Sequence, residues 1–399
     1  MKPRILIVTQ HFPPENSGNA SRIYDLSRNL VLLGCEVTVI SPHPTFPHGS
    51  FKRIWKRYSC KEIDGIEHFN ILAWQPTIRD PSFVSRIGYY LTFPIHAIWW
   101  GFLKRREYDV IITSAPPIFS GLTGYVIKKI TRKKWIVDVR DLWIDASIGL
   151  GFIKKNSFFE KVSRIYEKLC YRDCDRIAVT TEEIKKKIVY TYNISNEKII
   201  IVPNGVDTEL FIPLTIKKNR IIYTGNIGHA QDLEKVILAV KKVNEKFPLE
   251  FYLVGDGDTK NDLMELVEKE GLKEIVIFTG PLEREKMPSL IAESLIGIAP
   301  LKNLDSLRYA VPTKVYEYMA CGIPFIGTGT GEIEYLVKQS SAGVVAKNTV
   351  ESIYEHMIHL LENEELMKKV GKHGREFVEK YYNRRKIAEY LLYSIENVV

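Results

Sequence analysis

The chain has 399 residues, 45% hydrophobic and 26% charged, which excludes disordered, collagen-like and multi-span membrane proteins and favours two domains over one. Its net charge of +8 is uneven, since residues 1–205 contain 31 Lys and Arg against 19 Asp and Glu, and the rest contains 25 against 29. A basic first half can bind phosphates or anionic lipid, and the lack of a zinc-finger spacing or an RNP-like motif argues against nucleic acid.

The first 42 residues predict a strand, a loop, a helix and a second strand. Residues 5–8 and 37–40 are short apolar runs suited to strands that are buried on both faces. Between them, residues 21–33 place apolar side chains at helical spacing, with Gly34 as a candidate C-cap. This βαβ unit indicates a parallel sheet.

The N-terminal apolar run is also too short for the core of a signal peptide. The five cysteines are odd in number and include no CxxC pair, so neither a disulfide framework nor a zinc site is indicated. We therefore expect a cytoplasmic protein in a reducing compartment.

Residues 87–103 contain no charged side chain and are flanked by Arg86 and by the basic residues 104–106. A length of 17 residues is at the lower limit of a membrane-spanning helix, and Pro94 lies inside the segment, which disfavours spanning. The Trp and Tyr residues beside a basic run suit a helix at a membrane interface, so that residues 87–106 would contact an anionic membrane surface. A buried helix of the first domain is the alternative.

Further apolar runs predict two series of strands. The first domain continues with runs at 110–112, 135–137 and 176–179, and a second series follows residues 203–205 with runs at 220–223, 251–254, 275–278, 296–299 and 324–326. We predict an α/β fold of two tandem, Rossmann-like, doubly wound domains. Because ligands of such sheets bind beyond the carboxyl ends of the strands, the expected site is a cleft between two such edges.

Glycine-containing loops follow three of these strands at places where a phosphate can approach the backbone. Gly18 opens the first helix, where backbone amides and the helix dipole favour an anion. Gly225 with Asn226, and Gly255, follow strands of the second domain. The first loop lacks the GxGxxG pattern, so no dinucleotide fingerprint is present.

Lys314 and Glu317 lie three residues apart and share one face of a predicted helix. They could form a solvated ion pair, which is the usual fate of such residues. Alternatively, Lys314 neutralises a leaving diphosphate and Glu317 holds a sugar or ribose hydroxyl. Lys302 and Arg308 are the reserve cations, because phosphate binding without a metal requires cations or helix N-termini.

Five segments, in this order along the chain, resemble the GT-B glycosyltransferases of family 4. They are the loop at 12–20, the segment 139–143, the linker 202–207, the turn 225–228 and the stretch 312–324. The match runs nearly end to end, and it is most similar to the WbuB-like amino-sugar transferases.

The resemblance implies a retaining, metal-independent transfer of a hexose or an N-acetyl amino sugar from a UDP-sugar to a lipid-linked or polysaccharide acceptor. No cofactor is implied besides the nucleotide sugar. It also implies an acceptor-binding domain at 1–204, a donor-binding domain at 205–383, and a last helix at 384–399 that crosses back to the first domain. The leaving diphosphate would take the proton of the acceptor hydroxyl, and the protein would lie on the inner face of the cell membrane.

Some residues match the motifs of the family, and others depart from them. Glu317 matches the second glutamate of the family's E-x7-E motif, which is expected to contact the donor ribose, whereas Tyr309 replaces the first. Asn226 stands where an Arg of the phosphate-binding pair is usual, which leaves Lys314 as the candidate for the diphosphate. Arg140 and Asp141 are expected near the reacting centre, although many family members carry a His at position 140.

Other functions remain open at this stage. A UDP-sugar epimerase shares this architecture, and a catalytically degenerate transferase could act as a binding partner, as the replacements at 226 and 309 would allow. His11, His43 and His48 lie in loops of the first domain, and any of them could be a base at the acceptor site.

Overall fold

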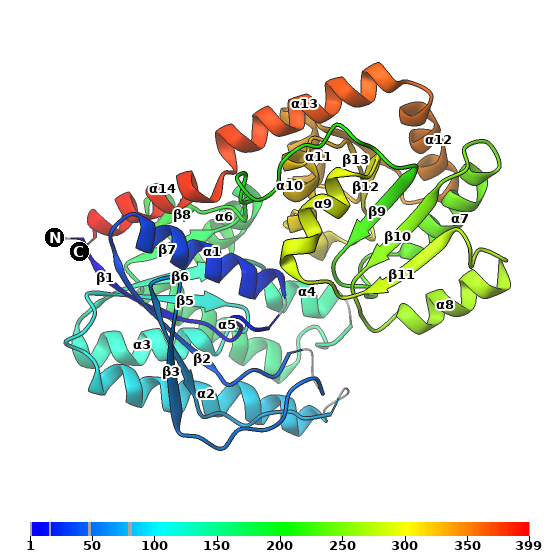
Figure 1. The fold of residues 1–399 in the computed structure, drawn as a ribbon. Coiled ribbons are helices and arrows are strands. Elements are labelled where there is room, and N and C mark those ends of the chain that lie inside the picture. The colour runs from blue at the N-terminus through cyan, green and yellow to red at the C-terminus, as the bar shows by residue number, and fades with distance from the viewer. Residues whose placement is uncertain (1, 16, 47–48, 79–81, 150, 399) are drawn as a thin grey trace. The chain divides into compact units, whose positions relative to one another are not determined.

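The computed structural model describes residues 2–15, 17–46, 49–78, 82–149 and 151–398 (Figure 1). It divides into two compact units, Met1–Pro203 with Arg384–Val399, and Asn204–Asn383. The division falls one residue before the boundary expected from the sequence. Each unit has its own sheet and its own core, and the predicted α/β fold of two doubly wound sheets is confirmed.

Unit 1 contains an eight-stranded sheet in the order β3-β4-β2-β1-β5-β6-β7-β8. All neighbouring strands are parallel except β3 and β4, which form an antiparallel pair. The strands are β1 (Arg4–Val8), β2 (Glu36–Pro42), β3 (Tyr58–Ile63), β4 (Ile66–Ile71), β5 (Val110–Ala115), β6 (Lys134–Val139), β7 (Arg176–Val179) and β8 (Ile199–Ile201). The helices are α1 (Gly18–Leu32), α2 (Phe83–Leu103), α3 (Ser120–Thr131), α4 (Trp143–Gly149), α5 (Phe158–Asp173), α6 (Glu182–Tyr192), α14 (Arg384–Glu396) and a 3-10 turn, η1 (Asn196–Lys198).

The C-terminal helix α14 belongs to the core of unit 1. It packs beside α1 against the sheet (Figure 1), and Ile387 and Leu391 join Ile23 and Leu26 of α1 in one buried apolar cluster. Arg384, at the start of α14, forms a buried ion pair with Asp25 of α1. The last helix therefore belongs to unit 1, although it follows unit 2 in the sequence.

Unit 2 contains a six-stranded sheet, all parallel, in the order β11-β10-β9-β12-β13-β14. The strands are β9 (Arg220–Thr224), β10 (Glu250–Val254), β11 (Val276–Gly280), β12 (Ile296–Ala299), β13 (Phe325–Thr328) and β14 (Gly343–Ala346). The helices are α7 (Leu233–Asn244), α8 (Lys260–Lys269), α9 (Met287–Ala292), α10 (Thr313–Ala320), α11 (Glu332–Ser340), α12 (Val350–Leu361), α13 (Glu364–Tyr381), and the 3-10 turns η2 (Arg284–Lys286) and η3 (Asp305–Leu307).

Helix α2 contains the aromatic segment that was open to two interpretations. Tyr89, Phe93 and Ala97 are buried in unit 1. Every fourth residue of the other side is exposed, and we call this row the α2 ridge: Leu91, Ile95, Trp99 and Leu103. The helix therefore packs onto its unit and also presents apolar side chains to solvent. Within the described residues, no helix combines the length and the apolarity that crossing a membrane requires.

Candidate functional site

The loops that follow β9 and β10 lie against each other at the carboxyl edge of the second sheet. The amide of Gly225 donates to the carbonyl of Val254 at 2.8 Å, and the amide of Ile227 donates to the carbonyl of Asp256 at 2.9 Å. Gly255 has a φ of +137°, and a Cβ atom there would lie 1.9 Å from the carbonyl oxygen of Gly225. Only glycine fits this approach, which keeps the two loops together.

Lys314 lies at the start of α10, beside the first of these loops. A Cβ atom on Gly225 would be 3.5 Å from both Cε and Nζ of Lys314, and Nζ lies 3.7 Å from the centre of the Tyr223 ring. The lysine is only 9% exposed, and burial lowers its pKa to about 7, opposed by the charge of Glu317. In the part of the chain that the structure describes, no carboxylate lies within ion-pair distance of Nζ. The solvated ion pair that the spacing also allowed is therefore not formed.

Glu317 lies on the next turn of α10 and is half-buried. Burial raises its pKa, while the charges of Arg284 and Lys314 oppose that rise. Arg284 was not predicted from the sequence. It follows β11, so the rule that ligands bind beyond the carboxyl ends of strands could have identified it.

The remaining donor-site candidates lie in segments that follow β9 and β12 in unit 2. Asn226 is exposed in the loop after β9, and its carbonyl accepts a hydrogen bond from the Tyr223 hydroxyl. Lys302, Arg308 and Tyr309 lie in the segment between β12 and α10. The structure therefore brings Gly225, Asn226, Gly255, Lys314 and Glu317 to one edge of unit 2, and their roles stay predictions.

Unit 1 has a cavity of about 280 Å³ at the carboxyl ends of β1, β5 and β6. It is lined by His11, Ser17, Asn19, Phe46, Tyr90, Pro116, Pro117, Arg140 and Trp143. Ser17 is the N-cap of α1, because its side chain accepts a hydrogen bond from the amide of Ala20 at 3.2 Å. Gly18, the first residue of α1, is exposed between two of the lining residues. Both polar side-chain atoms of Asn19 are buried and have no partner among the described residues.

Arg140 brings a positive charge to this cavity. Its Nη2 atom donates to the carbonyl of Pro116 at 2.5 Å, whereas its Nε atom is buried with no partner among the residues described. Burial lowers its pKa to about 10, so the guanidinium stays charged at neutral pH. Asp141 was predicted to act beside it, but this residue is exposed and does not line the cavity.

Of the three candidate histidines, the structure places one in the cavity. His11 lines it, whereas His43 is buried with its Nε2 atom 3.0 Å from the carbonyl of Lys56, and burial lowers its pKa. His48 lies outside the described residues.

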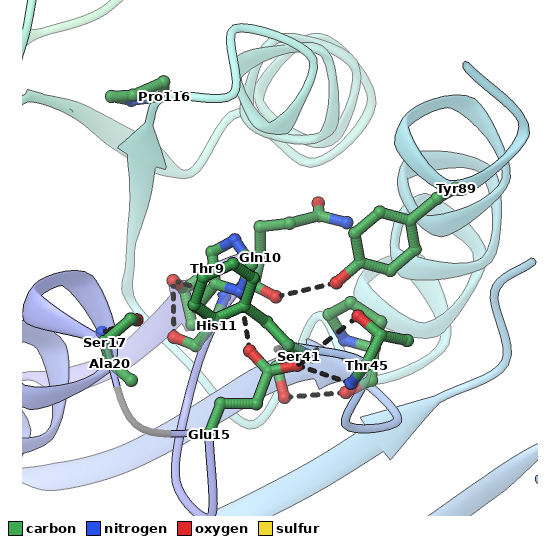
Figure 2. A network of polar contacts seen from close by, with 12 residues as sticks. Thr9, Gln10, His11, Glu15, Ser17, Ala20, Ser41, Thr45, Tyr89 and Pro116 are labelled. Carbon is green, nitrogen blue, oxygen red and sulfur yellow. Dashed lines mark hydrogen bonds and ion pairs between the residues drawn. The ribbon is translucent and has the colours of Figure 1, made fainter. Parts of the chain in front are cut away.

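The Glu15 carboxylate contacts the imidazole ring of His11, as Figure 2 shows. Its Oε2 atom lies 2.6 Å from Nδ1 of His11. Its Oε1 atom accepts hydrogen bonds from the amides of Thr45 at 2.6 Å and Phe46 at 2.8 Å. No role for Glu15 was predicted from the sequence, and its spacing of four residues from His11 in one loop is the signal that could have suggested it.

The described residues include no group of three or more His, Cys, Asp or Glu side chains placed to hold a metal ion. The positive groups at the two edges are instead Lys314 with Arg284 in unit 2 and Arg140 in unit 1. Each edge therefore carries basic side chains at the carboxyl ends of parallel strands.

Comparison with known proteins agrees with this arrangement. Residues 17–210 match the family model described as Glycosyltransferase Family 4, and residues 208–377 match the model described as Glycosyl transferases group 1. A relative from Escherichia coli strain K12, named as a colanic acid biosynthesis glycosyl transferase, WcaI, is 23% identical over 340 residues, which is 80% of this chain and 81% of the relative.

Two further proteins extend the comparison. A relative from Arabidopsis thaliana, named as part of a phosphatidylinositol N-acetylglucosaminyltransferase, is 23% identical over 337 residues, covering 83% of this chain and 68% of the relative. The structure of HepE from Anabaena in complex with UDP-glucose has a TM-score of 0.73 at 13% identity, covering 99% of this chain and 100% of that one.

The two sheets of mostly parallel strands and these matches define a glycosyltransferase with the GT-B fold. The chain belongs to the glycosyltransferases of the GT4 type. Its likeness to the WbuB-like subgroup stays a prediction.

Proposed function

We propose that the protein transfers a hexose or an N-acetyl amino sugar from a UDP-sugar bound to unit 2 to a lipid-linked or polysaccharide acceptor bound to unit 1. The transfer retains the anomeric configuration and needs no metal. The observation that carries the proposal is Lys314, a buried cation without a carboxylate partner among the described residues, beside two glycine loops at a sheet edge.

The donor assignment is supported by the chemistry of this edge. A diphosphate would supply the counter-ion that Lys314 lacks, and the loops of Gly225 and Gly255 let it approach backbone amides. The HepE complex contains UDP-glucose, which supports a UDP-sugar as the donor. Glu317, one turn further along α10, is placed to accept a hydrogen bond from a ribose hydroxyl.

The acceptor assignment is supported by the names of the relatives. One is assigned to colanic acid, a polysaccharide, and the other to phosphatidylinositol, a lipid. The α2 ridge supports a lipid-linked acceptor, because Ile95 and Trp99 are 63% and 55% exposed and basic residues follow the helix. Before α2 in the sequence, Arg53 stacks on Trp74, with the guanidinium 4.5 Å from the ring centre.

A thermal-shift panel with UDP, GDP, ADP and TDP, with and without EDTA, tests the donor site. A ligand at about 100 times its dissociation constant stabilises by about 2.7 kcal/mol, which is readily measured. We expect a shift with UDP that EDTA does not change. A shift that requires a divalent cation would contradict metal independence, and stabilisation by another nucleotide alone would contradict the UDP assignment.

Turnover is tested by UDP release from UDP-glucose and UDP-N-acetylglucosamine with octyl glycosides or phosphatidylinositol vesicles as acceptors. NMR of the product reports whether the anomeric configuration is retained. Formation of an isomerised UDP-sugar without acceptor would indicate an epimerase, and UDP binding without any turnover would indicate a degenerate binding partner.

Membrane association is tested separately by sedimentation with vesicles. We expect binding to vesicles that contain phosphatidylglycerol, weakening with salt, and loss of binding in the double variant Ile95→Ser and Trp99→Ser. Tyr190→Ala is the matched control, because Tyr190 is a 90% exposed aromatic on α6 of the same unit. Equal vesicle binding by the double variant and the control would contradict a membrane role of the α2 ridge.

A further inference from the structure

We infer that the cavity of unit 1 binds a phosphate group of the acceptor, and that Arg140 and Asn19 are the side chains that hold this group. The acceptor is then a glycosyl phosphate, such as a sugar joined to a lipid through phosphate, and not a neutral glycan. The inference rests on the proposed function and names the chemical class of its acceptor. All the residues that carry it belong to unit 1.

The first support is a cation without a counter-ion. Among the residues that the structure describes, no carboxylate lies within ion-pair distance of Arg140. Its guanidinium makes one hydrogen bond to them, from Nη2 to the carbonyl of Pro116, and its buried Nε atom makes none. The planar guanidinium matches the oxygen atoms of a phosphate, which would supply the missing negative charge.

The second support is that the carboxylates of the neighbouring segments are occupied or face elsewhere. One oxygen of Glu15 contacts the ring of His11, and the other accepts two backbone amide hydrogen bonds. Asp138, at the end of β6, forms an ion pair with Arg22 of α1 at 2.8 Å. Asp141 is exposed, and none of the three carboxylates lines the cavity. The charge of Arg140 is therefore available to a ligand.

The third support is the side-chain amide of Asn19. Its Oδ1 and Nδ2 atoms are both buried and have no hydrogen-bond partner among the described residues. Because buried polar groups are normally paired, an unpaired amide in the lining of a cavity indicates a missing ligand. Asn19 lies in the first turn of α1, which contains no acidic residue, so the helix dipole adds to the attraction for an anion.

The size and walls of the cavity favour a phosphate ester over free phosphate. Its volume of about 280 Å³ is close to the lower end of the range for small-molecule sites, roughly 300–1,000 Å³. Besides the polar groups, the walls are apolar or aromatic, with Phe46, Tyr90, Pro117 and Trp143 among them. A free phosphate would leave these walls without a partner, whereas the sugar of a glycosyl phosphate would cover them.

NMR of protein labelled with ¹⁵N-arginine tests binding directly. The Nε–H signal of Arg140 is assigned by its loss in Arg140→Gln. We expect this signal to move on titration with glucose 1-phosphate, at concentrations at least about tenfold lower than with inorganic phosphate, and to stay in place with octyl glucoside. Equal affinity for inorganic phosphate would make the cavity a general anion site and overturn the inference. An unmoved signal with glucose 1-phosphate would also overturn it.

A further titration separates the acceptor from the donor. In the variant Lys314→Met, which lacks the proposed donor cation, UDP should leave the Arg140 signal in place, whereas glucose 1-phosphate should still move it. Movement of the signal by UDP at similar concentrations would assign the cavity to the donor diphosphate and contradict the inference.

The variant Asn19→Asp tests the amide without changing its shape. A carboxylate here repels phosphate and offers no donor, so we expect the affinity for glucose 1-phosphate to fall at least about tenfold. An acidic residue suits the first turn of a helix, so the melting temperature should not fall, which separates lost binding from unfolding. Asn196→Asp, an exposed position of the same unit, is the matched control. Unchanged affinity in Asn19→Asp would exclude Asn19 from the site.

The activity arm compares two acceptors that carry the same sugar, octyl glucoside and glucose joined to octanol through a phosphodiester. With UDP release as the readout, we expect the wild type to prefer the phosphate-bearing acceptor at least about tenfold in kcat/KM. Arg140→Gln should lose this preference. Arg172→Gln, whose side chain is 68% exposed on α5, should keep it.

The inference and the proposed function fail differently. A wild-type enzyme that releases no UDP with any tested donor and acceptor contradicts the proposed function, while the NMR titrations still report on the cavity. An active wild type that shows no preference for the phosphate-bearing acceptor contradicts the inference alone.

Discussion

The ammonium group of Lys314 lies over the face of the Tyr223 ring, 3.7 Å from its centre. Lys314 comes from the start of α10 and Tyr223 from the end of β9, so the contact joins two neighbouring elements at the carboxyl edge of the second sheet. An aromatic face attracts a cation but leaves its charge uncompensated. A buried ammonium of this kind is ready to accept an anionic ligand.

We expect Lys314→Met to weaken UDP binding. Removing one partner of a buried charge pair costs about 2 to 5 kcal/mol, which corresponds to roughly 30- to 4,000-fold in affinity. Isothermal titration with UDP measures the loss. Lys368→Met, an exposed lysine of α13, is the matched control and should bind UDP as the wild type does. Equal UDP affinity in the two variants would show that the diphosphate binds elsewhere.

The same lysine makes stability depend on pH. Its folded-state pKa is about 7, below the value of about 10.4 expected in the unfolded chain, so between these values the unfolded state binds more protons. The free energy of unfolding therefore rises with pH across this window, and the penalty for charging Lys314 is fully present below about pH 7.

Lys314→Met removes this penalty. We expect the variant to melt at a higher temperature than the wild type near pH 6 to 7, with the difference shrinking towards pH 10. Thermal melts of both proteins without nucleotide, run in parallel across the pH range, measure the difference. A constant difference at all pH values would mean that Lys314 titrates normally.

Glu317→Gln tests the contact with the ribose. A hydrogen bond to a charged group is worth about 1.5 to 3 kcal/mol, so we expect UDP affinity to fall about 10- to 150-fold. The 2′,3′-dideoxy analogue of UDP lacks the hydroxyls, and its affinity should change little. Glu365→Gln, on the exposed side of α13, serves as the control. Equal losses with UDP and with the analogue would place Glu317 away from the ribose.

The central strands of both sheets could be predicted because each is an apolar run followed by a turn. Four strands were missed. Strand β4 was missed because Glu67, His68 and Asn70 interrupt its apolar residues. Strand β3 lies at the sheet edge and is mostly exposed, so its residues lack the apolar pattern of a buried strand. Strands β8 and β14 are edge strands of three and four residues, too short to show a periodicity.

The residues of the candidate site could also be predicted only in part. Lys314 was identified from its spacing with Glu317 on a predicted helix. Its contacts with Tyr223 and Gly225 form only in the folded chain. A Lys three residues before a Glu is equally typical of a surface helix. The role of Glu15 could not be derived from the sequence, because its partners include backbone amides of a distant loop. Asp141 is exposed and does not line the cavity, and its role stays a prediction.

Arg140→Lys tests the charge in the cavity of unit 1. Lysine keeps the positive charge but lacks the planar guanidinium. In Arg140 that group donates to the Pro116 carbonyl through Nη2 and still offers Nε to a ligand, and a lysine cannot make both contacts. We expect at least about a tenfold loss of kcat/KM for the acceptor, with the Kd for UDP unchanged. Steady-state kinetics with varied octyl glycoside and a UDP titration measure the two effects. A parallel loss of UDP affinity would assign Arg140 to donor binding instead.

Gly255→Ala tests whether the close approach of the two glycine loops is required. The new Cβ atom would lie 1.9 Å from the carbonyl oxygen of Gly225 at a φ of +137°, so the loops must move apart. Gly271→Ala is the matched control in the same unit, because its φ of +71° carries backbone strain but no atom lies within 4 Å of the added methyl.

We expect the control to lose about 1 kcal/mol of stability, seen as a small drop in melting temperature, and to bind UDP normally. The Gly255 variant should lose more stability and also most of its UDP affinity, because Gly225 is displaced from Lys314. Thermal melts and UDP titrations of the two variants separate strain from contact. Normal UDP binding by Gly255→Ala would show that the diphosphate does not depend on the juxtaposed loops.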